Sequence, residues 1–436
     1  MEVIFKYLKI PFELRVYFQE TRNRKINGSK MTNVKLMIDL GNSETRAVAQ
    51  IVEEGIVKHT RGYLLDNHFV VENLATKETY SPYIQSEDFN KLDSNVLEVS
   101  LQIGANKVDK LVMWGDLATA NLPKKLRTPV SHLAKADNLL NYVVLINLMD
   151  KVLDWVNMVY PSSTKQDLSK EVVFDLAVLV PPAQAVSART VFEQNLVRTF
   201  TYKNLYDGVE LDLKVNSVKV LPEGYSSFYS VFLSYGDLNP RPHYEDLASR
   251  NVLIIDFGEG TTDLIGVSSQ RLLDGLKHTI KIGGSTILSK VRASVNKRLG
   301  LDIPIASFKD VLKTCEVRYG STTHKVREDV EQAIYSVASD IAQEVFTYLR
   351  GAEVEVSSFD RLLLVGGGVV SNGSTVTISE ALLSELQLEL PTLDLVDLQY
   401  LKEDEIEGIP FDLTSPRYLN ILGLMTGVAL AQKAQG

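Results

Sequence analysis

Runs of apolar residues bounded by turn residues predict several β-strands along this chain. Residues 172–180 form an almost uninterrupted apolar run that ends at a Pro-Pro pair. Such a run is typical of a strand that is covered on both faces. Similar runs lie at residues 251–257 and 361–365. Residues 34–40 and 45–52 are two more, and the Gly-Asn-Ser turn between them predicts a hairpin.

Apolar residues at helical spacing predict helices between these strands. The pattern is clearest in residues 131–159, where leucine, valine and isoleucine recur every three or four positions. Strands that alternate with helices indicate a mixed α/β fold. The other predicted helices are residues 183–200, a helix after Gly283-Gly284, and residues 310–319, 324–350 and 416–434.

One strand–turn–strand pattern occurs twice in the chain. Residues 34–52 and residues 251–267 each contain an apolar strand that ends in an aspartate, Asp39 or Asp256, followed by a polar glycine-containing turn and a second strand. Two copies of one supersecondary unit predict two related domains that face each other across a cleft.

Composition and charge narrow the function classes. The chain has 436 residues, long enough for two or three domains, and its 45% hydrophobic content excludes a disordered or fibrous protein. The net charge of −9 disfavours direct binding to nucleic acid or to an anionic membrane. No apolar run approaches the ~20 residues of a membrane-spanning helix, and no signal peptide is evident. We therefore expect a soluble, cytoplasmic protein.

Cysteine and histidine usage argues against redox or thiolate chemistry. The single cysteine, Cys315, excludes disulfides within the chain, and we interpret it as a buried small hydrophobic residue. The six histidines have no metal-ligand spacing. Any metal ion would therefore need oxygen ligands.

The two turns carry residues suited to phosphate chemistry. In each, small residues let backbone N–H groups approach phosphate oxygens, and the aspartate at the strand end can hold hydrated Mg²⁺. Arg46 could return to the phosphates, although an ordinary hairpin turn explains the first unit about equally well. The first unit contains Asp39, Gly41, Asn42, Ser43 and Arg46. The second contains Asp256, Gly258, Glu259, Gly260, Thr261, Thr262 and Asp263.

A third glycine-rich segment follows the strand at residues 361–365. Gly366, Gly367 and Gly368 would let the backbone approach a flat ligand such as a purine. The chain has neither the G-x-G-x-x-G dinucleotide fingerprint nor a P-loop.

These segments together resemble the superfamily of actin, sugar kinases and heat-shock chaperone ATPases. Residues 39–46 resemble its phosphate-1 motif, residues 256–263 its phosphate-2 motif and residues 362–369 its adenosine motif. Residues 220–226 and 417–424 resemble its two connecting segments. The Pro-Glu pair in the first connecting segment is most similar to bacterial actins of the ParM/StbA plasmid-segregation type.

The resemblance implies a role for each matched residue. Asp39 and Asp256 would hold Mg²⁺ through its water shell, and the two turns would grip the phosphates of ATP, or of GTP. Glu223 would position or activate the attacking water, although a Pro-Glu pair is also an ordinary helix start. Asp263 stands where actin has a histidine, which leaves its role open. Gly283 and Gly284, with Glu316, would contact the ribose or the base, and Gly366, Gly367 and Gly368 would back the base.

The resemblance also implies a two-domain actin-like fold, a duplicated ribonuclease H-like architecture with the nucleotide between domains. We expect domain I at residues 31–250, domain II at 251–415, and a C-terminal helix, residues 416–436, that returns to domain I. Residues 1–30 are mildly basic and are interpreted as an extension, or alternatively as a partner-binding arm.

The function implied is a Mg-ATP-dependent ATPase that assembles head to tail into filaments for plasmid or phage DNA segregation. The DNA would be held through a separate DNA-binding adaptor protein. A non-polymerising kinase or phosphohydrolase of the same fold is the alternative. A cell-shape scaffold resembling MreB, held to a membrane by the apolar start of the chain, is a third possibility, although no membrane contact is expected.

Overall fold

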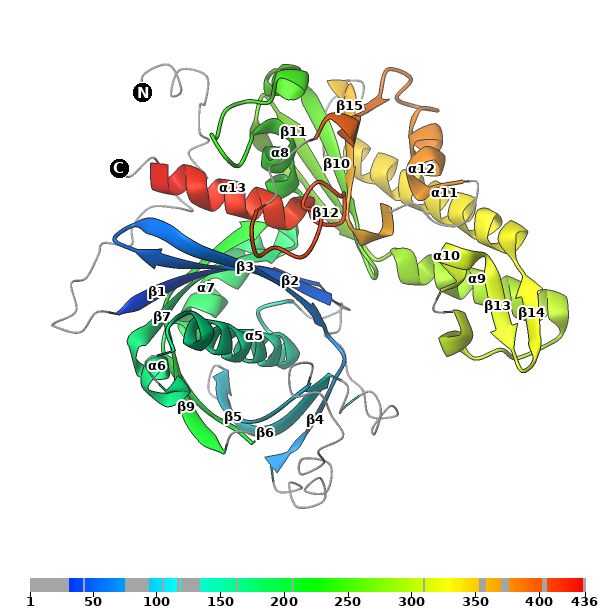
Figure 1. Cartoon of the computed structure of the whole chain (residues 1–436). Helices are drawn as coiled ribbons and strands as arrows, with labels where there is room; N and C mark the ends of the chain where they lie inside the picture. The colour runs from blue at the N-terminus through cyan, green and yellow to red at the C-terminus, as the bar shows by residue number, and fades with distance from the viewer. Residues whose placement is uncertain are drawn as a thin grey trace.

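The computed structural model describes residues 31–41, 44–74, 94–103, 106–115, 118, 134–161, 164–205, 208–308, 310–352, 358–369, 376–401 and 406–433. These residues form two mixed sheets, each with helices packed against it (Figure 1). The mixed α/β architecture predicted from the alternating strands and helices is therefore confirmed.

The larger sheet has nine strands in the order β3-β2-β1-β7-β9-β8-β5-β6-β4. Strand β7 spans the predicted residues 172–180 and runs parallel to both β1 and β9. Its central position explains why its apolar run is nearly continuous. The bounds are β1 Thr32–Leu40, β2 Glu44–Glu53, β3 Ile56–Asp66, β4 Phe69–Asn73, β5 Ser94–Ile103, β6 Asn106–Gly115, β7 Val172–Val180, β8 Thr199–Asn204 and β9 Val209–Pro222.

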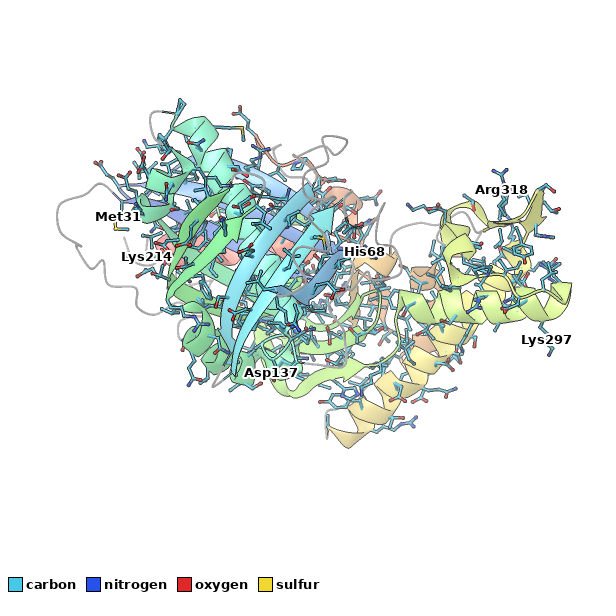
Figure 2. The ribbon with its side chains drawn as sticks, turned by 90° about the horizontal axis from the view of Figure 1, so that it is seen from below. Met31, His68, Asp137, Lys214, Lys297 and Arg318 are labelled. Atoms are coloured by element: carbon cyan, nitrogen blue, oxygen red, sulfur yellow. The ribbon has the colours of Figure 1, made fainter. Side chains whose placement is uncertain are left out.

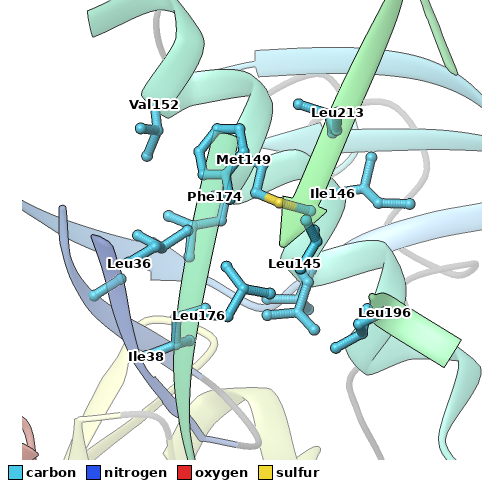
Figure 3. Close-up of a cluster of buried hydrophobic side chains, with 14 of the residues drawn as sticks. Leu36, Ile38, Leu145, Ile146, Met149, Val152, Phe174, Leu176, Leu196 and Leu213 are labelled. Atoms are coloured by element: carbon cyan, nitrogen blue, oxygen red, sulfur yellow. The ribbon is translucent and has the colours of Figure 1, made fainter. Parts of the chain in front are cut away.

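One face of this sheet packs against α5 (Leu139–Val159), with α6 (Lys165–Glu171) and α7 (Ala185–Leu196) beside it. Figure 3 shows Leu36 and Ile38 of β1 beside Phe174 and Leu176 of β7, next to Met149 of α5. All five side chains are buried. Each side chain of this size contributes roughly 1.5–3 kcal/mol of burial free energy, so this cluster anchors the strands that lead to the cleft.

The smaller sheet has five strands in the order β12-β11-β10-β15-β16. Its outer face packs against α9, α11 and α12. A separate hairpin, β13–β14, lies beyond the far end of α9. The bounds are β10 Asn251–Phe257, β11 Thr262–Ser268, β12 Arg271–Ile280, α9 Gly284–Leu299, α10 Val311–Thr314, β13 Glu316–Tyr319, β14 Thr322–Lys325, α11 Arg327–Gly351, β15 Arg361–Val365, α12 Ile378–Leu386 and β16 Asp394–Leu395.

The predicted duplication is visible in the strand pairing. In the larger sheet, β1 pairs with β2 as a hairpin and with β7 in parallel. In the smaller sheet, β10 pairs with β11 as a hairpin and with β15 in parallel. The registers also correspond, because Asp39 lies opposite Arg46 and Asp256 lies opposite Asp263.

Two helices lie between the sheets and join them. Helix α8 (Tyr225–Phe232) and helix α13 (Leu419–Lys433) pack against each other, and α13 also contacts β1, β2 and β7. Their contact is close, since a Cβ at Gly423 would lie 1.8 Å from the carbonyl oxygen of Ser226. Met37 of β1 and Ile254 of β10 both pack into this layer. The two sheets therefore share one continuous apolar layer.

Three of the predicted helices differ from the structure. The helix predicted at residues 131–159 begins at Leu139, where the Asn138 side chain accepts a hydrogen bond from the backbone N–H of Leu140. The one predicted to end at residue 200 ends at Leu196, and strand β8 follows. Only Val311–Thr314 is helical within residues 310–319, because Cys315 takes a left-handed conformation (φ 53°) and ends the helix.

Candidate functional site

A cavity of about 300 Å³ opens between the two sheets, at the ends of the duplicated hairpins. Asp39 comes from the end of β1, and Asp256 and Asp263 come from the paired strands β10 and β11. Glu223 follows directly after β9. The parallel arrangement of β1 with β7 and β9 brings the ends of these strands to one edge, so residues far apart in sequence share the cavity.

Four carboxylates in this cavity are almost fully buried. Asp39, Glu223, Asp256 and Asp263 are each less than 9% exposed. Burial raises the pKa of Glu223 to about 8, and repulsion from Asp39, Asp263 and Asp256 acts in the same direction, against the attraction of Lys135. The buried and crowded Glu223 carboxyl group therefore holds its proton more tightly than an exposed glutamate does.

Burial also raises the pKa values of Asp256 and Asp263, the two aspartates of the β10–β11 hairpin. Burial raises the pKa of Asp263 to about 7, although a hydrogen bond from the Thr279 hydroxyl partly offsets this effect. Burial raises the pKa of Asp256 to about 6, against a hydrogen bond of 2.6 Å from the Asn420 side chain. Perturbed carboxylates of this kind cluster at functional sites, because catalysis needs groups that hold or exchange protons near neutral pH.

Arg46 and Lys135 supply positive charge from the side of the larger sheet. The Arg46 guanidinium donates to Asp39 at 3.1 Å and to Glu44 at 2.9 Å. Lys135 forms an ion pair with Glu223 from a segment 88 residues earlier in the chain. Burial alone would lower the pKa of Lys135, but Glu223 and Asp39 raise it on balance. Both cations are thus held charged and point into the cavity.

Asn420 at the start of α13 links the helix layer to the carboxylates. Its amide nitrogen donates to Asp256, while its amide oxygen accepts from the Gly224 backbone N–H at 2.9 Å and the Ser227 hydroxyl at 2.6 Å. One buried side chain therefore fixes the second hairpin relative to α8 and to the residue that follows Glu223.

Gly366 brings the end of β15 against the second hairpin. Its φ of +100° is rarely adopted by residues with a side chain, and an added Cβ would lie 2.5 Å from the Asp256 carboxylate. With Gly367 and Gly368, it lines the cavity with backbone atoms on the side of the smaller sheet. The start of α9 closes the same side, since the Gly284 N–H donates to the Gly258 carbonyl at 3.0 Å.

The donor set fits a hydrated divalent cation. Carboxylates outnumber cations two to one among the charged residues that line the cavity, and an added cation would reduce this imbalance. Within the described residues, no group of three or more His, Cys, Asp and Glu side chains is placed to bind a metal directly.

Comparison with known proteins identifies the fold. A family model of the C-terminal part of archaeal MreB-like actin homologues matches residues 254–376. An archaeal actin homologue solved in complex with ADP superposes with a TM-score of 0.55 and 15% identity, over 90% of this chain and 98% of its own. The fold is actin-like. A search of curated protein sequences finds no significant match.

Two further actin-like structures superpose over nearly the full chain. The actin-like protein Alp7A has a TM-score of 0.59 and 14% identity, with 92% of this chain and 97% of its own covered. A subunit of a 15-stranded ParM filament from Clostridium botulinum has a TM-score of 0.53 and 14% identity, with 91% and 98% covered. At these identities the comparisons establish the actin-like fold alone.

Most of the site residues predicted from the sequence line the cleft of this actin-like fold. They come from both hairpins, the segment after β9 and the glycine-rich segment, so the structure brings together residues spread over more than 300 positions. The predicted residues that line it are Asp39, Gly41, Arg46, Glu223, Asp256, Gly258, Glu259, Thr261, Asp263, Gly284, Gly366, Gly367 and Gly368.

The other predicted site residues lie elsewhere. The Thr262 hydroxyl donates to the Ile282 carbonyl, which ties the β10–β11 hairpin to the segment before α9. Thr262, Gly260 and Gly283 are not among the residues that line the cavity. Asn42 and Ser43 fall outside the described residues. Glu316 lies exposed on β13 and outside the cavity lining, so the helix predicted at this position was wrong.

Several residues that line the cavity were not among the site residues predicted from the sequence. Lys135 precedes a helix in a segment without a recognisable motif, and only its contact with Glu223 reveals it. Asn420 lay within a recognised segment, but its bonds to Asp256 and α8 could not be inferred from spacing. Glu44, Asn138, Asn141, Gln184, Thr279 and Arg417 also line the cavity.

No helix in the described part of the chain is long and apolar enough to cross a membrane.

Proposed function

We propose that this actin-like protein is an ATPase that binds Mg-ATP in the cleft and assembles head to tail into dynamic filaments. The observation that carries the proposal is the convergence of both hairpins, four buried carboxylates and a bare glycine backbone on one cavity. The ADP complex of the archaeal homologue supports an adenine nucleotide, and the ParM filament supports self-assembly. GTP remains a second candidate nucleotide for testing.

Five charged residues of the cleft have proposed roles in ATP hydrolysis. A water oxygen attacks the γ-phosphorus, the bond from that phosphorus to the bridging oxygen breaks, and ADP and phosphate leave. Glu223 would accept the proton of the attacking water, a role that suits its raised pKa. Lys135 and Arg46 would bind phosphate oxygens. Mg²⁺, held through water by Asp39 and Asp256, would neutralise charge on the phosphates.

In the proposed assembly, closure of the cleft on the nucleotide would precede the contact between subunits. The expected domains, residues 31–250 and 251–415, would close on the nucleotide, with the C-terminal helix packed against domain I. A contact between unlike surfaces of successive subunits generates an open filament unless the rotation closes a ring. Plasmid or phage DNA segregation, through a DNA-binding adaptor, is the proposed use of that filament in the cytoplasm.

Light scattering, pelleting and phosphate release with Mg-ATP, Mg-GTP or no nucleotide test the proposal. We expect nucleotide-dependent polymer that disassembles as phosphate appears. In Glu223→Gln, phosphate release falls at least 100-fold and the polymer persists, whereas the matched control Glu316→Gln behaves like wild type because Glu316 lies outside the cleft. Nucleotide affinity, measured by calorimetry, shows that each variant is folded.

Two results would contradict the proposal. Absence of polymer at any concentration, with phosphate transfer only to an added small acceptor, would indicate a kinase of the same fold. Failure of the wild-type protein to bind any nucleoside triphosphate would remove the ATPase assignment altogether.

A further inference from the structure

The nine-stranded sheet bends back on itself around α5. Its two edge strands, β3 and β4, lie at opposite ends of the strand order, yet only Asn67 and His68 separate them along the chain. Figure 1 shows the strands curving around α5, and every α5 residue from Asn141 to Asp150 is buried. Figure 2 marks the connection between β3 and β4 by its second residue, His68. The connection therefore joins the two edges of the curved sheet.

Asn67 reaches from this connection to both strands of the first hairpin. Its amide nitrogen donates to the Gly41 carbonyl at 2.6 Å and to the Thr45 hydroxyl at 2.9 Å. Gly41 directly follows β1, and Thr45 is the second residue of β2. Asn67 and Thr45 are both 0% exposed. One buried side chain thus ties the two strands together at the end where they meet the cleft.

The bonds of Asn67 lie beside residues with proposed contacts to the nucleotide. Gly41 lines the cavity, and so does Arg46, the residue after Thr45 in β2. The last residue pair of the β1–β2 ladder is Leu40 with Thr45, so the bonds of Asn67 begin where the strand pairing ends. Asn67 itself is not among the residues that line the cavity. It therefore acts on a bound nucleotide only through the hairpin.

The second hairpin is held at the same two positions. Gly258 lies two residues after the aspartate that ends the first strand, as Gly41 does in the first hairpin. Thr262 lies six residues after that aspartate, as Thr45 does. The Gly258 carbonyl accepts a backbone N–H at 3.0 Å, and the Thr262 hydroxyl donates to a backbone carbonyl at 2.7 Å. Both partners lie within residues 282–284, so each hairpin is held by the segment that follows its third strand.

The two halves of the molecule achieve this by different means. The second half uses two backbone groups, whereas the first half uses the side chain of Asn67 alone. A carbonyl oxygen only accepts hydrogen bonds, so the partner of the Gly41 carbonyl must be a donor. An asparagine amide nitrogen carries two N–H groups, enough for both bonds. The position therefore calls for a side chain that donates twice from one atom.

We propose that Asn67 is a positioning residue that holds Gly41 and Arg46 in the geometry that binds the phosphates of the nucleotide. The inference rests on the proposed nucleotide site and adds a residue that supports it from outside the cavity. Without Asn67, the hairpin would lose its support on the cleft side of the last ladder pair, and the phosphate contacts would lose their alignment. These contacts hold the phosphates before the reaction as well as during it, so we expect the change in KM more than in kcat.

Steady-state phosphate release by the full chain tests the proposal. In Asn67→Ala, which removes both bonds, we expect the KM for Mg-ATP to rise at least tenfold while kcat stays within about threefold of wild type. Thr45→Val removes one bond and keeps the shape of the side chain, and its KM should rise about threefold. The double variant should have the KM of Asn67→Ala alone, because the bond that Thr45→Val removes is already lost.

The matched control is Asn95→Ala. Asn95 is another buried asparagine of the larger sheet, 4% exposed, and its side chain donates to Asn147 and Asp150 of α5. None of these three residues is among those that line the cavity. We expect Asn95→Ala and Asn67→Ala both to lower the midpoint of urea unfolding, and only Asn67→Ala to raise the KM. This comparison separates positioning of the hairpin from a general loss of stability.

Three results would overturn the inference. An unchanged KM in folded Asn67→Ala would show that the hairpin keeps its geometry without the amide. An equal rise of the KM in Asn95→Ala would show that any loss of stability in this sheet weakens nucleotide binding. If Asn67→Ala does not fold, Thr45→Val decides, and an unchanged KM in that variant would be the third. Absence of ATP turnover by the wild-type protein would instead contradict the proposed function, and the inference with it.

Discussion

Replacing Asp263 by asparagine should stabilise the nucleotide-free protein, and the gain should grow with pH. Asp263 is 4% exposed, and burial raises its pKa to about 7 from an ordinary value of 3.8. A carboxyl group whose pKa is raised on folding supports the folded state fully at pH values below about 4. That support is lost as the pH rises through about 7, because the folded protein must then bury a charge.

The magnitude follows from the size of the pKa shift. One pKa unit corresponds to 1.36 kcal/mol, so a shift of about three units costs roughly 4 kcal/mol once the group is ionised in both states. Only part of that cost is present at pH 5. The stability gained by Asp263→Asn should therefore increase by about 2 to 3 kcal/mol between pH 5 and pH 8. The asparagine oxygen can still accept the hydrogen bond from Thr279.

Equilibrium urea unfolding, followed by circular dichroism at pH 5 and pH 8 without nucleotide, measures this difference. The control is Asp302→Asn, whose side chain is 93% exposed and whose replacement should change stability by no more than about 0.5 kcal/mol at either pH. An equal gain at both pH values, or a variant less stable than wild type at pH 8, would refute the reasoning that the buried charge of Asp263 destabilises the empty cleft.

Two further substitutions probe the cleft, and a third probes a buried polar network between α5 and the larger sheet. Gly366→Ala should weaken ATP binding at least tenfold in calorimetry, because the added Cβ would clash with Asp256. The control is Gly300→Ala, which has open space around it. It should cost only about 1 kcal/mol of stability and leave ATP binding unchanged. Asn420→Ala should cost about 1–3 kcal/mol in urea unfolding, since buried groups lose their partners; an unchanged midpoint would contradict this. Asp150→Ala should cost about 3–5 kcal/mol, because Asp150 is 1% exposed and its loss leaves buried polar groups unpaired; a change below 1 kcal/mol would show that the network relaxes.

Local pattern was sufficient for the strands that build the cleft. The predicted runs at residues 172–180, 251–257 and 361–365 coincide with β7, β10 and β15. These strands are buried on both faces, so their apolar runs are nearly continuous. Polar or turn residues follow each run and mark where the strand ends. The repeated hairpin was visible for a related reason, because a strand that ends in an aspartate and a glycine turn leaves a local signature.

Helix ends were less predictable, because apolar spacing continues past the residue at which a helix stops. Leucine, valine and phenylalanine recur at helical spacing up to residue 200, yet Phe200 lies in β8, where it is 3% exposed and packs in the core of the larger sheet. The helix predicted at residues 310–319 was too long for the same reason. A left-handed Cys315 ends a four-residue helix, and Glu316 then pairs with Lys325 across a hairpin.

The sequence by itself determined the α/β class, the duplicated hairpins and most of the residues in the cleft, since each is encoded within a few consecutive positions. Only the tertiary structure decided that Lys135 meets Glu223 and that Asn420 joins Asp256 to α8. These contacts span 88 and 164 residues and depend on how the strands and the central helices pack.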